Sequence, residues 1–213
     1  LFTEVELTGN QFGLESRGKT TVISSNVLGN DDDGIWTESR GSSLTVLYST
    51  VSGNGINGIR IGAESKAKIV TSTISGNGGF GIGIGPATVE ASTITDNGGG
   101  IYVYRRTTLR TSIVAGNDAF GGDCQTQGAA QLRVLAPTLI GDVGSCTIVG
   151  PAGAVLTGDP MLGPLQNNGL STETHALLPG SPAIGVLTRK TQCKTPDQRG
   201  LMRSAPCDLG AYE

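Results

Sequence analysis

The sequence has few aromatic and few charged residues for its length. Of 213 residues, 4% are aromatic and 15% are charged, and the formal net charge is −3. This low net charge, together with 37% hydrophobic residues, excludes an intrinsically disordered chain. The 15 basic residues do not outnumber the 18 acidic ones, so we expect no nucleic-acid partner. No apolar run approaches the roughly 18 residues of a membrane-spanning helix, so no transmembrane segment is expected.

Histidine and closely spaced cysteines are also scarce. The chain has one histidine, His175, and its four cysteines include no Cys-x-x-Cys pair, so a zinc site is difficult to build. An even number of cysteines in a loop-rich region favours two disulfides, with free thiols as the alternative. We expect pairing between neighbours in the sequence, which joins Cys124 to Cys146 and Cys193 to Cys207. Disulfides would place the protein outside a reducing cytosol.

Glycine is abundant, with 34 residues, and the first half of the chain repeats every 20 to 24 residues. An apolar residue stands three positions before each repeated asparagine, and a serine stands five positions before all but the first. A glycine followed by an apolar residue comes after five of the six asparagines. These asparagines are Asn10, Asn30, Asn54, Asn77, Asn97 and Asn117.

A period of this length, with β-branched residues and Gly-Asn turns, predicts a parallel β-solenoid. Each copy would form one coil of three short strands, giving about six coils. Alternation supports this interpretation, because Ile59 and Ile61 would point inward while Arg60 points outward. We therefore expect an all-β chain with solenoid repeats over residues 1–117. Residues 118–213 would form final irregular coils and a C-terminal cap that contains proline and cysteine.

The asparagine column is expected to be structural. Asparagine tolerates left-handed backbone geometry, and its amide can hydrogen-bond the next asparagine along a stack. We favour such a ladder over the alternative, which is a row of polar ligands.

The C-terminal region carries a specific resemblance. Its ordered blocks are Leu139–Asp142, Asp159–Gly169, Thr174–Ile184, Asp197–Gly200 and Cys207–Glu213. They resemble the C-terminal part of the bacterial surface and secreted β-helix proteins called choice-of-anchor Q proteins. The chain departs from that pattern at 169–172, where Gly-Gly-Pro-Thr is usual, and at Gly185, where Asp is frequent. The resemblance implies a right-handed parallel β-helix at the bacterial cell surface or outside the cell, and it implies no activity.

Both ends of the predicted solenoid suggest contacts. We expect the C-terminal segment to fold over the last coil and to block its strand edges. The chain enters the repeat almost at once, so preceding sequence or another molecule is expected to cover the first coil. Self-association into a homopolymer or lattice would satisfy these edges. An outward aliphatic column, Ile23, Leu47 and Val70, is a candidate assembly interface, with packing on the C-terminal segment as the alternative.

A second outward face combines aromatic and basic side chains around two glycines. Trp36, Arg60, Tyr102 and Tyr104 would flank a shallow depression at Gly83 and Gly85, where an aromatic ring can stack on a sugar. This face is a candidate glycan-binding site, and a solvated sheet face is the alternative.

Catalytic and metal sites have weaker support. The acids of the aromatic face are Glu15 and Glu38, and neither has neighbours in the sequence that would raise its pKa, so no catalytic residue is assigned. Asp31 and Asp33 precede a glycine in a turn and form a weak calcium candidate, with a solvated turn as the alternative. No cofactor is expected.

The sequence thus predicts an extracellular structural or adhesive β-solenoid module that self-assembles end to end. The alternative is a β-helix protein that binds or degrades a polysaccharide as a lyase or glycosidase. We leave enzymatic activity open and lean against it.

Overall fold

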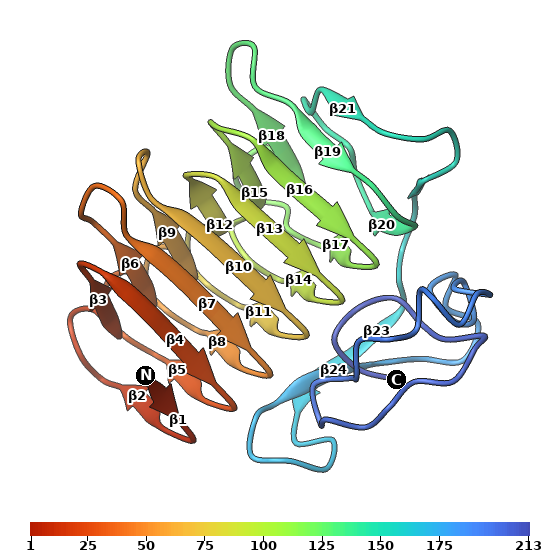
Figure 1. Cartoon of the computed structure of the whole chain (residues 1–213), viewed down its shortest axis with the longest axis horizontal. Helices are drawn as coiled ribbons and strands as arrows, with labels where there is room; N and C mark the ends of the chain where they lie inside the picture. The colour runs from red at the N-terminus through yellow and green to blue at the C-terminus, as the bar shows by residue number, and fades with distance from the viewer.

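Each repeat of the sequence forms one coil of a parallel β-solenoid in the computed structural model, which describes residues 1–213 (Figure 1). The chain has 24 strands and no helix, so it contains no helix suited to crossing a membrane. Three parallel sheets run along the solenoid axis, and six coils contribute a strand to each of them. Two further coils contribute strands to only two sheets. The predicted all-β solenoid of about six coils is confirmed.

The sheets are numbered in the order in which the chain visits them. Sheet 1 contains β1 (Phe2–Thr3), β4 (Lys19–Ile23), β7 (Ser43–Leu47), β10 (Lys66–Val70), β13 (Ala87–Glu90), β16 (Thr107–Arg110), β19 (Leu132–Val134) and β21 (Ile148–Val149). Sheet 2 contains β2 (Glu6–Thr8), β5 (Asn26–Leu28), β8 (Thr50–Ser52), β11 (Thr73–Ser75), β14 (Thr93–Thr95), β17 (Ile113–Ala115), β20 (Thr138–Ile140) and β22 (Val155–Leu156). Sheet 3 contains β3 (Leu14–Ser16), β6 (Ile35–Thr37), β9 (Ile59–Ile61), β12 (Phe80–Ile84), β15 (Gly99–Val103) and β18 (Cys124–Thr126).

The core fills the inside of the coils with stacked aliphatic side chains. In each sheet the inward residues of successive strands are register partners, as for Val46 with Ile69 and Ile74 with Ile94. These side chains are buried completely, and each contributes roughly 1.5–3 kcal/mol to the stability of the stack. β-Branched residues suit this position because they pack well on a pleated surface.

Serines fix the corner between sheets 1 and 2. The residue before each serine has a positive φ, for example 51° at Tyr48 and 48° at Thr71. The following serine hydroxyl donates to the carbonyl two residues earlier, as Ser49 does to Leu47 O at 2.7 Å. Its oxygen also accepts the backbone N–H of the serine in the preceding coil. A strained corner is thereby held by the same two bonds in coil after coil.

The second corner corrects one expectation. The left-handed residue there is the one before the asparagine, such as Gly29 (57°) and Gly53 (64°), and Asp96 takes this place once at 57°. No asparagine of the column has a positive φ. The asparagine is therefore selected for its side-chain amide, and the preceding glycine supplies the turn.

The C-terminal segment lies along the flank of the solenoid rather than over the last coil (Figure 1). After β22 the chain turns back and forms an antiparallel pair, β23 (Leu162–Gln166) and β24 (Thr174–Leu177). It then runs over the outer face of sheet 2. This face attracts it because Ile113, Ala115 and Leu139 form a small second core there with residues of the segment. Burial of these apolar side chains stabilises the segment on the outer face of sheet 2.

Polar contacts extend the attachment toward the first coils. The hydroxyls of Thr50, Thr73 and Thr93 are buried and bond to the segment at Glu173 O, Gln198 Oε1 and Ala211 N. His175 is 4% exposed and lies 2.8 Å from Ser75 Oγ through Nε2 and 2.7 Å from Gly163 O through Nδ1. The one histidine therefore joins segment and solenoid.

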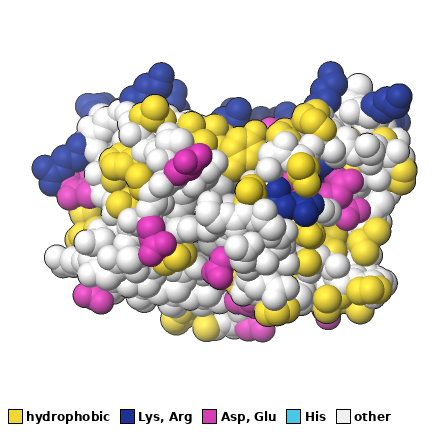
Figure 2. Space-filling model, turned by 90° about the horizontal axis from the view of Figure 1, so that it is seen from below, with side chains coloured by type: hydrophobic (Ala, Val, Ile, Leu, Met, Phe, Trp, Pro, Cys, Tyr) yellow, Lys and Arg dark blue, Asp and Glu magenta, His cyan; other side chains and the backbone are white.

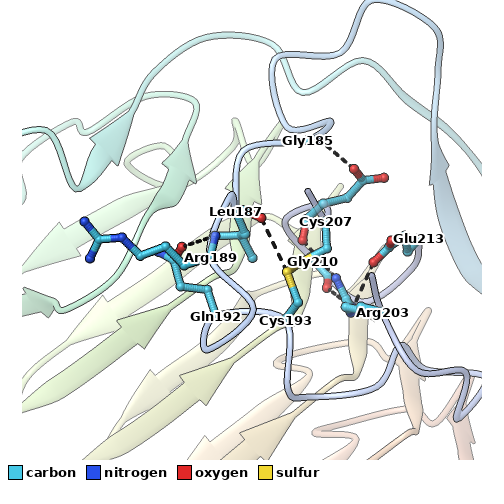
Figure 3. The surroundings of a disulfide bond; sticks show 10 residues. Gly185, Leu187, Arg189, Gln192, Cys193, Arg203, Cys207, Gly210 and Glu213 are labelled. Atoms are coloured by element: carbon cyan, nitrogen blue, oxygen red, sulfur yellow. Dashed lines mark hydrogen bonds and ion pairs between the residues drawn. A yellow bond between two sulfur atoms is a disulfide. The ribbon is translucent and has the colours of Figure 1, made fainter. Parts of the chain in front are cut away.

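Both expected disulfides are confirmed. Cys124–Cys146 ties β18 to the loop after β20, and its Cα atoms are 5.5 Å apart. Cys193–Cys207 lies within the C-terminal segment, beside the buried side chain of Arg203 (Figure 3). Arg203 donates to the carbonyls of Asp208 and Gly210, and burial lowers the pKa of its guanidinium.

Candidate ligand-binding faces

The six asparagines form one continuous row inside the corner between sheets 2 and 3. The side-chain amide of Asn54 donates to Asn77 Oδ1 at 2.8 Å and to the carbonyl of Val27 in the preceding coil at 3.2 Å. Its own oxygen accepts two bonds from Asn30. Every amide from Asn30 to Asn97 is bonded to the coil before and the coil after it, so no polar atom of these side chains is free for a ligand.

The row ends at a residue that the repeat pattern did not single out. Asp123 is buried, and its Oδ1 accepts the backbone N–H and the amide of Asn117 at 2.9 and 2.8 Å. Its Oδ2 accepts the backbone N–H of Asp142 at 2.7 Å. A carboxylate fits here because donors approach it from both sides. Burial raises the pKa of Asp123, while the hydrogen bonds from Asn117 and Asp142 oppose that rise.

The aromatic face lies on the outside of sheet 3. Trp36 pairs with Arg60, Arg60 with Gly83, and Gly83 with Tyr102, so these residues form one column along the axis. A Cβ atom at Gly83 would have no neighbour closer than 4.0 Å, which leaves open space in the column between Arg60 and Tyr102. Tyr104 is 44% exposed and lies beyond the end of β15, next to Arg105.

The rings of this face contact one another. Phe12 lies 5.4 Å from Trp36, and the Arg60 guanidinium lies 4.9 Å from the centre of the Trp36 ring. Phe80 lies 5.2 Å from Tyr102, whose hydroxyl donates to Gln127. Trp36 and Tyr102 thus each have an aromatic neighbour that their place in the repeat did not reveal.

A buried carboxylate orients the arginine of this face. Asp33 is 0% exposed and accepts the side-chain amide of Asn57 at 2.7 Å, and its other oxygen lies 3.3 Å from Arg60. Asp31 is exposed. The two candidate calcium ligands therefore differ in environment, and no group of three or more His, Cys, Asp or Glu side chains is arranged to hold a metal ion.

The two acids of the aromatic face share one arginine. Arg17 lies 2.7 Å from Glu15 and 3.2 Å from Glu38. The hydrogen bond from Arg17 lowers the pKa of Glu15, with a smaller contribution from Glu38. A general acid needs a raised pKa, so the lowered pKa of Glu15 argues against its use as an acid catalyst.

The aliphatic column lies where sheet 1 meets the C-terminal segment. Ile23 and Leu47 are half-buried, and Val70 is only 8% exposed. The neighbouring Thr71 donates to the carbonyl of Pro196. The three side chains thus share an edge of sheet 1 and differ in their exposure.

The outer face of sheet 1 holds basic residues that were not singled out from the sequence. Lys19, Lys66, Lys68 and Arg106 line an open groove of about 670 Å³ together with hydroxyl and aliphatic side chains. Figure 2 shows Lys and Arg side chains mainly along the upper edge of the view, with a further group on the face beside Asp and Glu, which are scattered over that face. The alternation of outward residues within each strand is the signal that could have revealed this surface.

Comparison with known proteins gives one match. Residues 2–85 match the family model described as the right-handed β-helix region. No curated protein and no solved structure gives a significant match. Over its first four coils the chain is therefore similar to right-handed β-helix proteins, in agreement with the parallel sheets of the solenoid.

Proposed function

We propose that this chain is an extracellular structural and adhesive module without enzymatic activity. The observation that carries the proposal is the coil-to-coil bonding. Backbone pairing, the asparagine row and the serine corners tie each coil to its neighbours, and two disulfides secure the C-terminal part. Such a rod keeps its outer faces at fixed spacing, as an adhesive surface requires. Disulfides favour an oxidising compartment, which is consistent with a place outside the cell.

The module would associate end to end. Strands β1, β2 and β3 each pair on one side only, so their other edges offer backbone groups to a further coil. A second copy stacked there by its last coil would continue sheets 1 and 2 through its β21 and β22, at the spacing of about 4.8 Å between strands. Ile23 and Leu47 offer a candidate lateral contact between such rods.

Electron microscopy of the purified protein at two concentrations tests the assembly. We expect short rods at the lower concentration and longer filaments at the higher one. Isolated rods at both concentrations would refute end-to-end association. Leu47→Lys should remove lateral bundling and leave filament length unchanged.

The second candidate function is glycan binding on the aromatic face. The open space over Gly83, between Arg60 and Tyr102, favours it. Binding of neutral oligosaccharides that is lost in Tyr102→Ala would support this candidate. Release of new reducing ends from a polysaccharide panel would overturn the non-enzymatic proposal.

A further inference from the structure

Beside the aliphatic column, the outward side chains of sheet 1 form two further columns that the strand register defines. In the first column Lys19 pairs with Ser43, and Ser43 pairs with Lys66. Arg106 continues this column. The residue after it, Thr107, pairs with Ala87, and Ala87 pairs with Ala67, which is the residue after Lys66. The second column contains Thr21, Thr45, Lys68, Thr88 and Thr108 in register.

The cations of these columns have no partners. Lys19, Lys66, Lys68 and Arg106 are all exposed, and none takes part in a salt bridge. The groove that they line contains no carboxylate. Four unpaired positive charges therefore lie together on a protein whose net charge is −3. Self-repulsion among them is relieved when an anionic ligand binds.

A second hollow extends the basic surface toward the C-terminal coils. Arg106 belongs to both hollows, and the second one adds Arg105 and Arg133 beside Tyr104. Its volume is about 500 Å³. Basic residues thus follow the axis from β4 to β19, so an extended ligand is a better fit than a compact one.

The spacing of the first column indicates what kind of ligand fits. Lys19, Lys66 and Arg106 stand two strands apart, which corresponds to about 10 Å between successive cations. One sugar of an extended polysaccharide advances by about one strand spacing. Cations on every second strand therefore match a chain with an acidic group on every second sugar. Hydroxyls of the adjacent threonine column can bond the sugar hydroxyls between these groups.

We propose that the outer face of sheet 1 binds an acidic polysaccharide whose chain runs parallel to the solenoid axis. The groove on sheet 1 contains no aromatic residue, and Tyr104 in the second hollow is a single ring, whereas a single-stranded nucleic acid stacks successive bases on several rings. Its aliphatic members Leu44, Ala67 and Ala87 are buried and Pro86 is half-buried, so it offers no large exposed apolar side chain for insertion into a membrane. This site supplies the ligand for the adhesive role, and it uses no contact that holds the scaffold together.

The test compares binding of three polymers to the full-length chain by affinity electrophoresis at low and high salt. The polymers are hyaluronan, with a carboxylate on every second sugar, polygalacturonate, with one on every sugar, and neutral dextran. We expect binding in the order hyaluronan, polygalacturonate, dextran, and weaker retention at high salt because the contacts are charged. Stronger binding of polygalacturonate would overturn the spacing argument, and equal binding of dextran would overturn the charge argument.

Charge reversal identifies the face. Lys66→Glu combined with Lys68→Glu should weaken hyaluronan binding by roughly tenfold or more and leave the melting temperature unchanged, since both side chains are exposed. The matched control is Lys190→Glu with Lys194→Glu, which makes the same charge change on exposed lysines of the C-terminal segment. An equal loss in the control would show non-specific attraction and overturn the site. Competition by single-stranded DNA of equal charge, at equal or lower concentration, would also overturn it in favour of a general polyanion surface.

The outcome separates this inference from the scaffold proposal. Rods that assemble but bind no acidic polysaccharide would refute the site on sheet 1 alone. A protein that binds hyaluronan through Lys66 and Lys68 but forms no filaments would refute end-to-end assembly alone.

Discussion

The solenoid and the C-terminal segment are stabilised in opposite ways. In the solenoid one set of contacts recurs in each coil, such as the rungs from Asn30 to Asn54 and from Asn54 to Asn77. In the C-terminal segment each contact occurs once, such as that of His175 with Ser75. Repetition spreads stability along the axis, whereas the segment depends on a few individual bonds and one disulfide. Loss of one contact should therefore have different consequences in the two regions.

The largest effect is expected from removing a middle rung of the asparagine row. Asn54→Ala deletes the acceptor for Asn30 and the donor to Asn77 and leaves buried polar atoms without partners. We expect a loss of about 2–5 kcal/mol in the free energy of unfolding, measured by urea denaturation. The matched control is Asn10→Ala at the exposed start of the row, for which we expect a loss of about 1 kcal/mol or less. Equal losses at both positions would show that the rungs do not act as a buried ladder.

The next effect concerns the C-terminal segment alone. Replacing Cys193 and Cys207 by alanine removes a cross-link with a sequence separation of 14 residues, and we expect a loss of about 2–4 kcal/mol. Limited proteolysis should then cut within residues 159–213 while residues 1–156 stay intact. Cleavage that starts within the repeats would contradict the independence of the two regions.

The smallest effect is a pH dependence at the end of the asparagine row. Because the pKa of Asp123 is raised above 3.8 in the folded protein, the folded state binds a proton more tightly than the unfolded state does. Stability contributed by this group is therefore present below pH 3.8 and is lost as pH rises through the raised value. Asp123→Asn should lack this dependence, so wild type should lose stability relative to the variant across that interval. Thermal melts of both proteins at a series of pH values measure the difference, and parallel curves would contradict it.

The contrast between repeated and single contacts also explains which features could be predicted from the sequence. The coils, the inward columns around Ile59 and Ile69 and the disulfide pairing followed from periodicity and spacing, and the structure confirms the fold and the bridges. The position of the C-terminal segment did not follow, because Thr73 and Gln198 are 125 residues apart and their contact has no second copy to form a pattern.

The candidate faces show that overall composition does not reveal where charged side chains gather on the surface. Net charge averages over the whole surface, and the value of −3 obscured the four cations gathered over sheet 1. Only the strand register shows that Lys19 and Lys66 stand in one column. Asp123 was missed for a related reason, since it follows Asn117 by six residues and falls outside the period.

The asparagine row also gives the rod a direction. Each rung donates from one coil to the next, from Asn10 through Asn97 to Asn117, and the last donors end on the carboxylate of Asp123. A coil stacked before Asn10 must therefore bring a donor, whereas Asp123 offers only acceptors at the other end. The two ends of the row are chemically unlike, and Asp123 cannot supply the donor that Asn10 requires, so the row is interrupted at a head-to-tail junction. A head-to-tail filament built from this chain would be polar, with distinguishable ends, and each junction would be held by backbone pairing without an asparagine rung.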